Sequence, residues 1–186
     1  MDDLQIIDLY WARSESAIAE TARKYGPYCR SIARNILHSE EDSEECVNDT
    51  WLKAWEAMPP RRPASLSAFL GRITRNLSLN RRKALSAEKR GGSQADLAAE
   101  ELRDVLPAAG SVEKTVEDRE LAAVFDRFLS QLGEEARRLF VRRYWYLSPI
   151  REIAVEYGMS ESKVKMSLLR SRRKLKELLE KEGIDL

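Results

Sequence analysis

An acidic segment, EEDSEECVND at positions 40–49, holds six carboxylates and one cysteine but no positively charged side chain. Carboxylates and thiols can ligate metal ions or transfer protons, so the segment is a candidate metal or catalytic site. Zinc requires three or four nitrogen or sulfur ligands, whereas the chain has one histidine, His38, and two distant cysteines, Cys29 and Cys46. The glycine and the alternating oxygen ligands of an EF-hand calcium loop are also absent from the segment. We therefore expect no metal and no cofactor, and another role for these carboxylates.

Catalytic patterns are missing from the rest of the sequence as well. It contains no GxSxG nucleophile elbow, no phosphate-binding P-loop, and no cysteine–histidine pair with a third residue to orient it. We expect a protein that is not an enzyme, in which Cys29 and Cys46 are small buried apolar residues.

The expected location is the cytoplasm. Two cysteines without CxxC spacing fit a reducing compartment. The N-terminal stretch, MDDLQIIDLYWARSESA, begins acidic and lacks the apolar core of a leader peptide. No apolar run approaches the length of about 18 residues that a membrane helix needs, so we expect no membrane insertion.

Charge is unevenly distributed along the chain, although the formal net charge is only +1. Nine lysines and arginines lie between positions 61 and 90, against one acid, Glu88. Positions 163–176 carry seven more and no acid, and acidic stretches precede each basic segment. This pattern predicts two separate contacts with a polyanion such as nucleic acid.

The segments that carry these charged residues have helical periodicity. No alternating strand pattern is clear, so we expect an all-α protein. The expected helices run from about Asp3 to Lys24, from Pro27 through Leu37, from near Ser43 to the MPPRRP segment, from Ser65 or Ser67 through Leu79, and over 116–132, 134–145, 149–157 and 160–181. Residues 85–111 contain Gly-Gly, Pro and a late Gly, which predicts a linker with at most a short helix. The aromatic and apolar side chains expected in the core are Val47, Trp51, Leu52, Trp55, Phe69, Trp11 and Tyr28.

The last helical joint predicts a helix-turn-helix. Ser148 and Pro149 are suited to start one helix, and Gly158 to end it in the left-handed conformation. Ser160 is suited to cap the next helix, with Met159 packing on Val164 across the cap. The expected inner stripe of that helix is Val164, Leu168 and Leu175. The outward residues placed to reach DNA are Ser162, Lys163, Lys165, Met166, Leu169 and Arg170, with Arg172, Arg173, Lys174 and Lys176 placed for phosphates. The alternative is a basic amphipathic helix that only solvates a bundle.

A second basic stretch, LGRITRNLSLNRRKA, places arginine and asparagine on one broad helical face. These side chains can bind phosphates and base edges. The preceding loop, PPRRPASLS, is stiff and basic. The loop and the helix together suit a nucleic-acid strand with exposed bases. The alternative is a solvated charged face.

In this order, the segments resemble the extracytoplasmic-function (ECF, group IV) sigma factors of bacterial RNA polymerase. Residues 21–83 resemble sigma region 2 through TARKYGPYCRSIARNIL, DSEECVNDTWLKAW and AFLGRITRNLSLNRRK, and residues 117–182 resemble sigma region 4. The resemblance implies an all-α protein of two small helical domains joined by a flexible linker. We expect region 2 at 1–84, the linker at 85–114 and the region 4 helix-turn-helix domain at 115–186.

The resemblance also implies roles and partners. The acidic helix corresponds to the part that docks on the clamp of core RNA polymerase, through Glu45, Asn48 and Asp49. The positions matching the reader of a partly single-stranded −10 element are Arg61, Arg62, Ser65, Arg72, Arg75, Asn76, Asn80 and Arg81. The positions matching the reader of a duplex −35 element are Ser162, Lys163, Lys165, Met166, Leu169, Arg170 and Arg173. Further implied partners are the polymerase flap and an anti-sigma protein.

Three functions could account for parts of this pattern. A transcription initiation factor explains both basic segments and the acidic helix. An autonomous helix-turn-helix regulator explains only the last helices, and an adaptor helical bundle predicts no affinity for DNA. Phe69, Asn80 and Met166 differ from the residues usual in the ECF group, so the family pattern does not give the promoter sequence.

Overall fold

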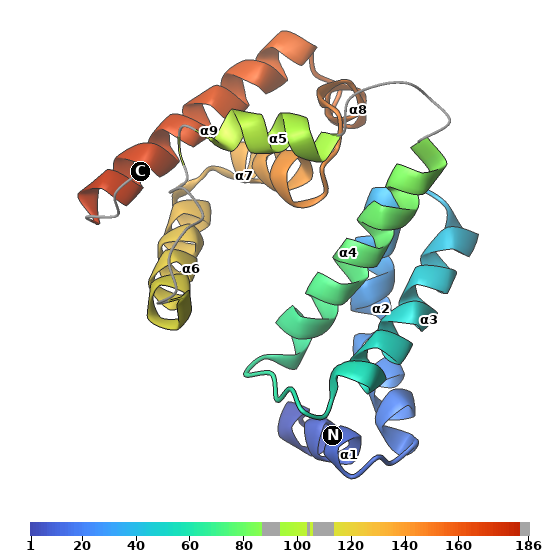
Figure 1. The fold of residues 1–186 in the computed structure, drawn as a ribbon. Helices are drawn as coiled ribbons and strands as arrows, with labels where there is room; N and C mark the ends of the chain where they lie inside the picture. The colour runs from blue at the N-terminus through green and yellow to red at the C-terminus, as the bar shows by residue number, and fades with distance from the viewer. Residues whose placement is uncertain (87–93, 104, 106–113, 183–186) are drawn as a thin grey trace. The chain divides into compact units, whose positions relative to one another are not determined.

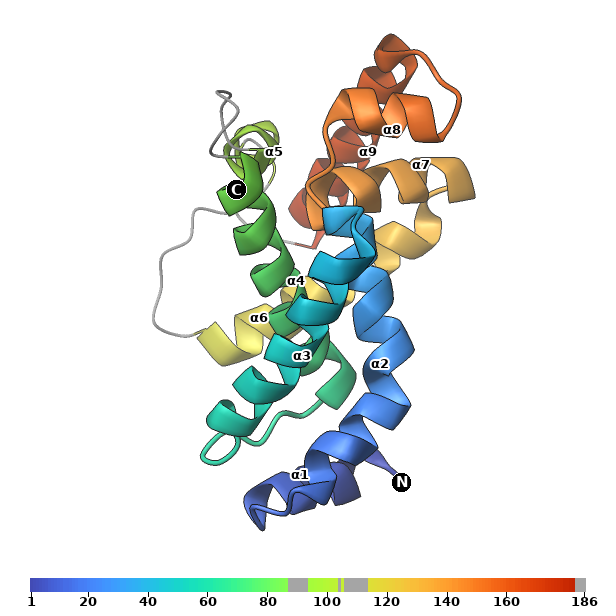
Figure 2. The ribbon, with the colours of Figure 1, turned by 90° about the vertical axis from the view of Figure 1, so that its right-hand side faces the viewer.

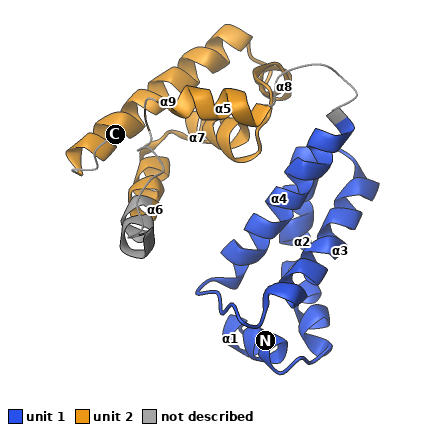
Figure 3. Cartoon of the chain, in the orientation of Figure 1, with its two compact units in different colours: residues 1–91 blue, residues 92–186 orange. Residues whose placement is uncertain are grey.

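The structure, a computed structural model, describes residues 1–86, 94–103, 105 and 114–182 (Figure 1). Over that part of the chain every regular element is a helix, which confirms the all-α prediction. The chain divides into two compact units, residues 1–91 and 92–186 (Figure 3). Each unit has its own apolar core.

The first unit consists of four helices around one core. They are α1 (Asp3–Trp11), α2 (Ser16–Leu37), α3 (Glu40–Ala57) and α4 (Leu66–Ser86). The three long helices pack against one another, and α1 packs against α2 (Figure 2). Leu66 and Leu70 of α4 and Met58, just after α3, are fully buried in this core. The prolines after Met58 separate α3 from α4, as the MPPRRP segment predicts.

The predicted helix over residues 3–24 is wrong, because the chain turns between α1 and α2. Arg13 has a positive φ of 53° at this turn, and its Nη1 donates a hydrogen bond to the Trp55 carbonyl oxygen at 2.8 Å. The turn folds α1 back onto α2, so that Tyr10 is fully buried and its hydroxyl lies 3.0 Å from that of Thr21. A continuous helix would leave the apolar face of α1 in water, where burial could not stabilise it.

The predicted break at Gly26-Pro27 is also wrong. Helix α2 continues through exposed Pro27, and its last turns bury Ile32 and Ile36. An interior proline removes one backbone hydrogen bond and costs about 3 kcal/mol. Burial of two isoleucines contributes about the same or more, at about 1.5–3 kcal/mol each, so tertiary packing overrides the local signal.

Helix α3 begins earlier than the predicted start near Ser43. Its cap is Ser39, whose Oγ accepts a hydrogen bond from the backbone N–H of Asp42 at 3.3 Å. Carboxylates fill the first turn, where the positive end of the helix dipole stabilises them. Ser43 is instead buried within the helix.

Three of the expected core residues lie at the surface. Leu52 is 53% exposed, Tyr28 is 43% exposed and Trp11 is 42% exposed. Trp51 and Phe69 are buried as expected, and Trp55 is half-buried. Helical spacing alone does not say how wide the buried stripe is, and Leu52 follows Trp51 just beyond its edge.

The second unit is built around a helix-turn-helix. Its elements are α5 (Gln94–Leu102), α6 (Lys114–Gln131), α7 (Glu134–Phe140), the π-helical turn η1 (Val141–Trp145), α8 (Ile150–Glu156) and α9 (Glu161–Lys181). Helix α5 lies inside the stretch expected to be a linker with at most a short helix. The remaining linker residues, 87–93, 104 and 106–113, lie outside the described residues.

The joint between α8 and α9 follows the local rules. Gly158 has a positive φ of 61°, and the Ser160 Oγ accepts a hydrogen bond from the Lys163 backbone N–H at 3.2 Å. Val164, Leu168 and Leu175 are buried, which confirms the predicted inner stripe.

The predicted cap at Ser148 is wrong. The N-cap of α8 is Pro149 instead. The Ser148 hydroxyl is buried and has no hydrogen-bond partner among the described residues. Its carbonyl oxygen accepts a hydrogen bond from the Arg143 Nη1 at 3.1 Å, so this end of α8 is held through the backbone.

Candidate functional site

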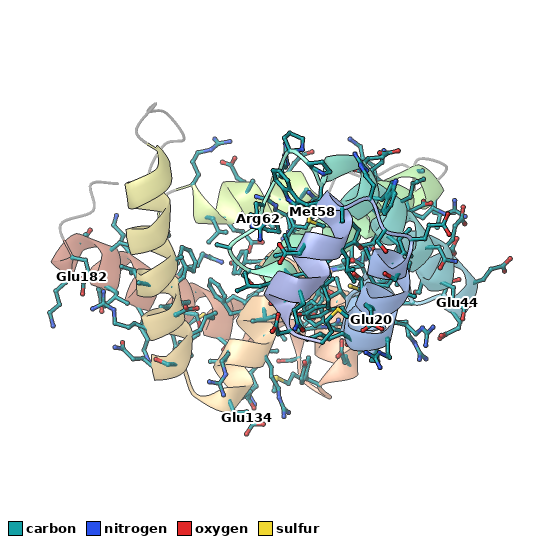
Figure 4. All side chains as sticks on the ribbon, turned by 90° about the horizontal axis from the view of Figure 1, so that it is seen from below. Glu20, Glu44, Met58, Arg62, Glu134 and Glu182 are labelled. Carbon is teal, nitrogen blue, oxygen red and sulfur yellow. The ribbon has the colours of Figure 1, made fainter. Side chains whose placement is uncertain are left out.

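The acidic segment forms the solvent face of α3. Glu45, Asn48 and Asp49 are exposed, whereas Cys46 and Val47 between them are buried. Figure 4 shows this part of α3, near the labelled Glu44, at the outer edge of the unit. Among the residues that the structure describes, no group of three or more His, Cys, Asp or Glu is placed to hold a metal ion. The arrangement presents negative charge to the outside, which suits a basic protein surface.

Leu52 adds an apolar side chain to this face, which sequence reasoning missed. It lies three residues after Asp49 and four after Asn48, so the three side chains share one side of the helix. The only sequence signal was its spacing from the polar positions.

Arg81 lies against the acidic helix. Its Nη2 is 2.8 Å from an oxygen of Asp42 and 2.9 Å from an oxygen of Glu45. Hydrogen bonds with Ser39 and Arg81 lower the pKa of the Asp42 carboxyl. The hydrogen bond with Asp42 in turn raises the pKa of Arg81. One predicted DNA-binding residue is therefore ion-paired with one predicted polymerase-binding residue.

A groove of about 530 Å³ lies between α3, the loop after it and α4. Four of the eight residues predicted for the −10 element line this groove: Arg61, Arg72, Asn76 and Asn80. Phe69, Ile73 and Leu77 supply its apolar lining. An apolar wall surrounded by guanidinium and amide groups can accept a planar base and hold its edge or phosphate. Lys53 and Ala57 of α3 also line the groove, and sequence reasoning missed them because they belong to another helix.

The other predicted −10 residues do not line this groove. Arg62 forms an ion pair with Asp8 and lies over the Trp11 ring at 5.7 Å. The Ser65 hydroxyl accepts a hydrogen bond from the Ala68 backbone N–H at 3.3 Å, which supports the start of α4. Arg75 is half-buried, and burial lowers its pKa. These residues have structural contacts that the sequence pattern did not indicate.

The predicted −35 residues project from the outer side of α9. Leu169 is half-buried. The other six are exposed: Ser162, Lys163, Lys165, Met166, Arg170 and Arg173. Two of the lysines form exposed ion pairs, Lys163 with Glu135 at 3.4 Å and Lys165 with Glu161 at 3.9 Å. Exposed pairs contribute little, about 0–1 kcal/mol, so DNA phosphates can replace them.

Arg172, for which a phosphate contact is expected, makes contacts within the second unit instead of projecting outward. Its side chain is 19% exposed, and its Nη1 donates a hydrogen bond to the Tyr144 hydroxyl at 2.6 Å. The same nitrogen lies 3.3 Å from Glu101, 71 residues away in the chain. Because its partners are so distant in sequence, no local pattern predicts this contact.

No helix in the described part of the chain has the length and apolar character to cross a membrane.

Comparison with known proteins gives matches for both units. Residues 21–88 match the family model of sigma-70 region 2, and residues 122–175 match that of sigma-70 region 4. The "Probable RNA polymerase sigma factor RfaY" of Xanthomonas campestris pv. campestris is 27% identical over 153 residues. That match covers 81% of this chain, but the chain spans only 38% of the length of that relative.

A solved structure, the sigma factor RpoE in complex with the anti-sigma factor NepR from Bartonella quintana, is 21% identical, with a TM-score of 0.36. The match covers 87% of this chain and 96% of that chain. The two matched regions make up well over half of the 186 residues. The chain therefore belongs to the sigma-70 family of RNA polymerase sigma factors, with the region 2 and region 4 pair of its extracytoplasmic-function (ECF) group.

Proposed function

We propose that this protein is a transcription initiation factor of the ECF sigma type, which binds core RNA polymerase and directs it to promoters. The observation that carries the proposal is that both family regions are present, each with a polar surface suited to DNA. These surfaces are the groove of the first unit and the outer side of α9. In this proposal the protein acts in the cytoplasm by binding rather than by catalysis.

The polymerase contact is proposed on α3, where Glu45, Asn48 and Asp49 meet a basic surface of the clamp. Carboxylates repel DNA phosphates, so this face suits a protein partner. Leu52 gives the contact an apolar centre, since it is exposed beside the same residues. The region 4 unit is proposed to contact the flap. From the family resemblance we further propose an anti-sigma partner.

The −10 contact is proposed in the groove, with a base removed from the stack against its apolar lining. Arg61 and Arg72 would bind the backbone, and Asn76 and Asn80 would bind base edges. Opening a base pair requires a few kcal/mol, and stacking and hydrogen bonds in the groove offset this. The −35 contact is proposed through α9, with Arg170 and its neighbours in the major groove.

A pulldown with core RNA polymerase, combined with DNA binding, tests the proposal. We expect the chain to elute with core polymerase and to bind promoter DNA in that complex. Tight binding of duplex promoter DNA by the chain alone, without association with core polymerase, would contradict the proposal. That result would instead favour an autonomous helix-turn-helix regulator.

A further inference from the structure

A buried arginine links α5 to the rest of the second unit. Arg143 of η1 is only 2% exposed, yet it carries a full charge. Its Nη2 donates a hydrogen bond to Glu101 at 2.6 Å, and its Nη1 donates to Gln94 at 2.9 Å. Both acceptors belong to α5, so this helix and the Ser148 carbonyl together supply the polar partners that a buried guanidinium needs.

Glu101 collects three donors at once. Besides Arg143, the Tyr144 hydroxyl donates to it at 2.8 Å and Arg172 of α9 lies 3.3 Å away. Arg172 in turn donates to the Tyr144 hydroxyl at 2.6 Å. Charge-assisted bonds of this kind are roughly twice as strong as neutral ones. The three side chains Arg143, Tyr144 and Arg172 thus form a site for one carboxylate, called the carboxylate receptor below.

Apolar contacts on the same face of α5 complete the docking. Ala98 is 2% exposed, and Leu102 and Val105 pack on the core cluster that contains Phe140. Ala98, Glu101 and Leu102 recur at helical spacing, so one face of α5 is apolar around a single carboxylate, and Val105 lies just after the end of the helix. Neighbouring Glu100 lies on the other side, with its side chain 61% exposed.

The docked position of α5 shortens the chain between the two units. Only seven residues, 87–93, separate Ser86 at the end of α4 from Gln94. Fully extended, they reach at most about 25 Å, and a flexible chain of that length spans about 15 Å. If α5 is released, the connection runs to Lys114 through 27 residues, which reach at most about 95 Å.

A promoter requires more reach than the docked form gives with a relaxed connection. Elements centred near −10 and −35 are about 25 base pairs apart, or roughly 85 Å at 3.4 Å per pair. A small domain is about 30 Å across. The widths of both units plus a relaxed short connection of about 15 Å come to about 75 Å, which falls short of roughly 85 Å, whereas a relaxed connection of 27 residues, about 29 Å long, covers it.

We propose that Arg143, Tyr144 and Arg172 form a carboxylate receptor on the region 4 unit, which Glu101 of α5 occupies in the free protein and leaves when the two units occupy the −10 and −35 elements of one promoter. The receptor itself rests on the contacts within the second unit. Only the release step rests on the proposed function.

Hydrogen exchange on the full-length chain tests the receptor. In the unchanged protein we expect the amides of residues 98–102, which lie beyond the unbonded first turn of α5, to be protected. Glu101→Gln removes the charge that the receptor binds and is expected to raise their exchange about tenfold, whereas the matched control Glu100→Gln leaves it unchanged. Tyr144→Phe should also raise it, and the double variant should show less than the product of the two effects, because both remove one shared contact. Equal exchange in E101Q and E100Q, or no protection in the unchanged protein, would overturn the receptor.

Promoter binding by the complex with core polymerase tests the release step. A ligand that binds only the released form gains affinity when docking of α5 is weakened. The affinity rises by the same factor as the docking equilibrium constant falls. E101Q should therefore raise affinity for a fragment with both elements about tenfold and leave affinity for a −35-only fragment unchanged, while E100Q changes neither. If E101Q frees α5 but leaves affinity for the two-element fragment unchanged or lower, the release step is wrong. If the unchanged protein binds no promoter with core polymerase, the proposed function fails, and the exchange experiment still decides the receptor.

Discussion

Arg81 connects the two candidate surfaces of the first unit at the scale of single residues. It pairs with Asp42 and with Glu45, which is also a candidate polymerase contact. A change at Glu45 therefore also alters the surroundings of Arg81, so its effects on polymerase and on DNA would be mixed. Asp49 is exposed on the same face and gives a cleaner test of the docking surface.

We expect Asp49→Lys to weaken binding to core polymerase about tenfold or more, because the variant sets like charges against a basic partner surface. Its thermal midpoint should stay unchanged, because the side chain is exposed. Titration of core polymerase with labelled protein measures the affinity. Asp126→Lys, the same change on the exposed surface of α6, serves as control. Equal affinity of all three proteins would remove Asp49 from the docking surface.

Arg170 is expected to read a base, since it is exposed on the outer side of α9. Arg170→Ala should change the preferred base at one −35 position, at a cost of about 1–3 kcal/mol. Lys174→Ala should instead weaken all sequences alike, as loss of a phosphate contact does. Transcription from a randomised promoter library measures both. An unchanged base preference in the Arg170 variant would exclude it from the reader.

At the scale of elements, two glycines place opposite demands on the backbone. Gly158 ends α8 with a φ of 61°, whereas Gly26 lies inside α2. A Cβ atom would meet nothing within 4 Å at either position. Differences between their alanine variants therefore report backbone conformation alone.

We expect Gly158→Ala to destabilise the second unit by about 1–2 kcal/mol, because alanine disfavours the left-handed conformation. Gly26→Ala should stabilise the first unit by about 0.5–1 kcal/mol, because it reduces the freedom of the unfolded chain at a helical position. Urea unfolding followed by hydrogen exchange in each unit gives both values. Effects of the same sign would contradict the assigned backbone conformations.

Docking of α5 should depend on pH. Burial raises the pKa of Glu101, but hydrogen bonds from Arg143 and Tyr144 outweigh it and hold that pKa below its ordinary value of 4.5. A lowered pKa stabilises the docked form fully above pH 4.5, and this stabilisation is lost as pH falls through the lower value. Amide NMR signals of α5 recorded from pH 6 to pH 3 should show this step. An identical titration in the Glu101→Gln variant would assign it to another group.

Local signals predicted some elements and not others. The joint at Gly158 and Ser160 depends on neighbouring residues, so the sequence predicts its conformation well. Pro27 gave a strong local signal for a break, but the buried face of α2 overrode it. Glu101 lies 42 residues from Arg143 and 71 from Arg172, and no periodicity indicates such contacts.

At the scale of the whole molecule, function depends on combining surfaces from separate segments. The sequence predicts four of the polar residues that line the groove, but Lys53 and Ala57 enter it only because α3 packs beside α4. Most outer residues of α9 could be predicted, because one helix carries them, but Leu169 is half-buried and Arg172 is bound to Tyr144 and Glu101. The acidic face, the groove and the helix-turn-helix together match what an initiation factor needs. No one of these surfaces alone would indicate that function.

Run-off transcription with core polymerase over genomic fragments tests the central claim most directly. We expect discrete transcripts only when the protein is added, and their loss when Asp49→Lys replaces it. Promoter-specific transcripts require both polymerase docking and recognition of two DNA elements, so this one readout depends on all the proposed surfaces. Absence of any transcript that depends on the protein, although it is folded and core polymerase is active, would contradict its role as a sigma factor.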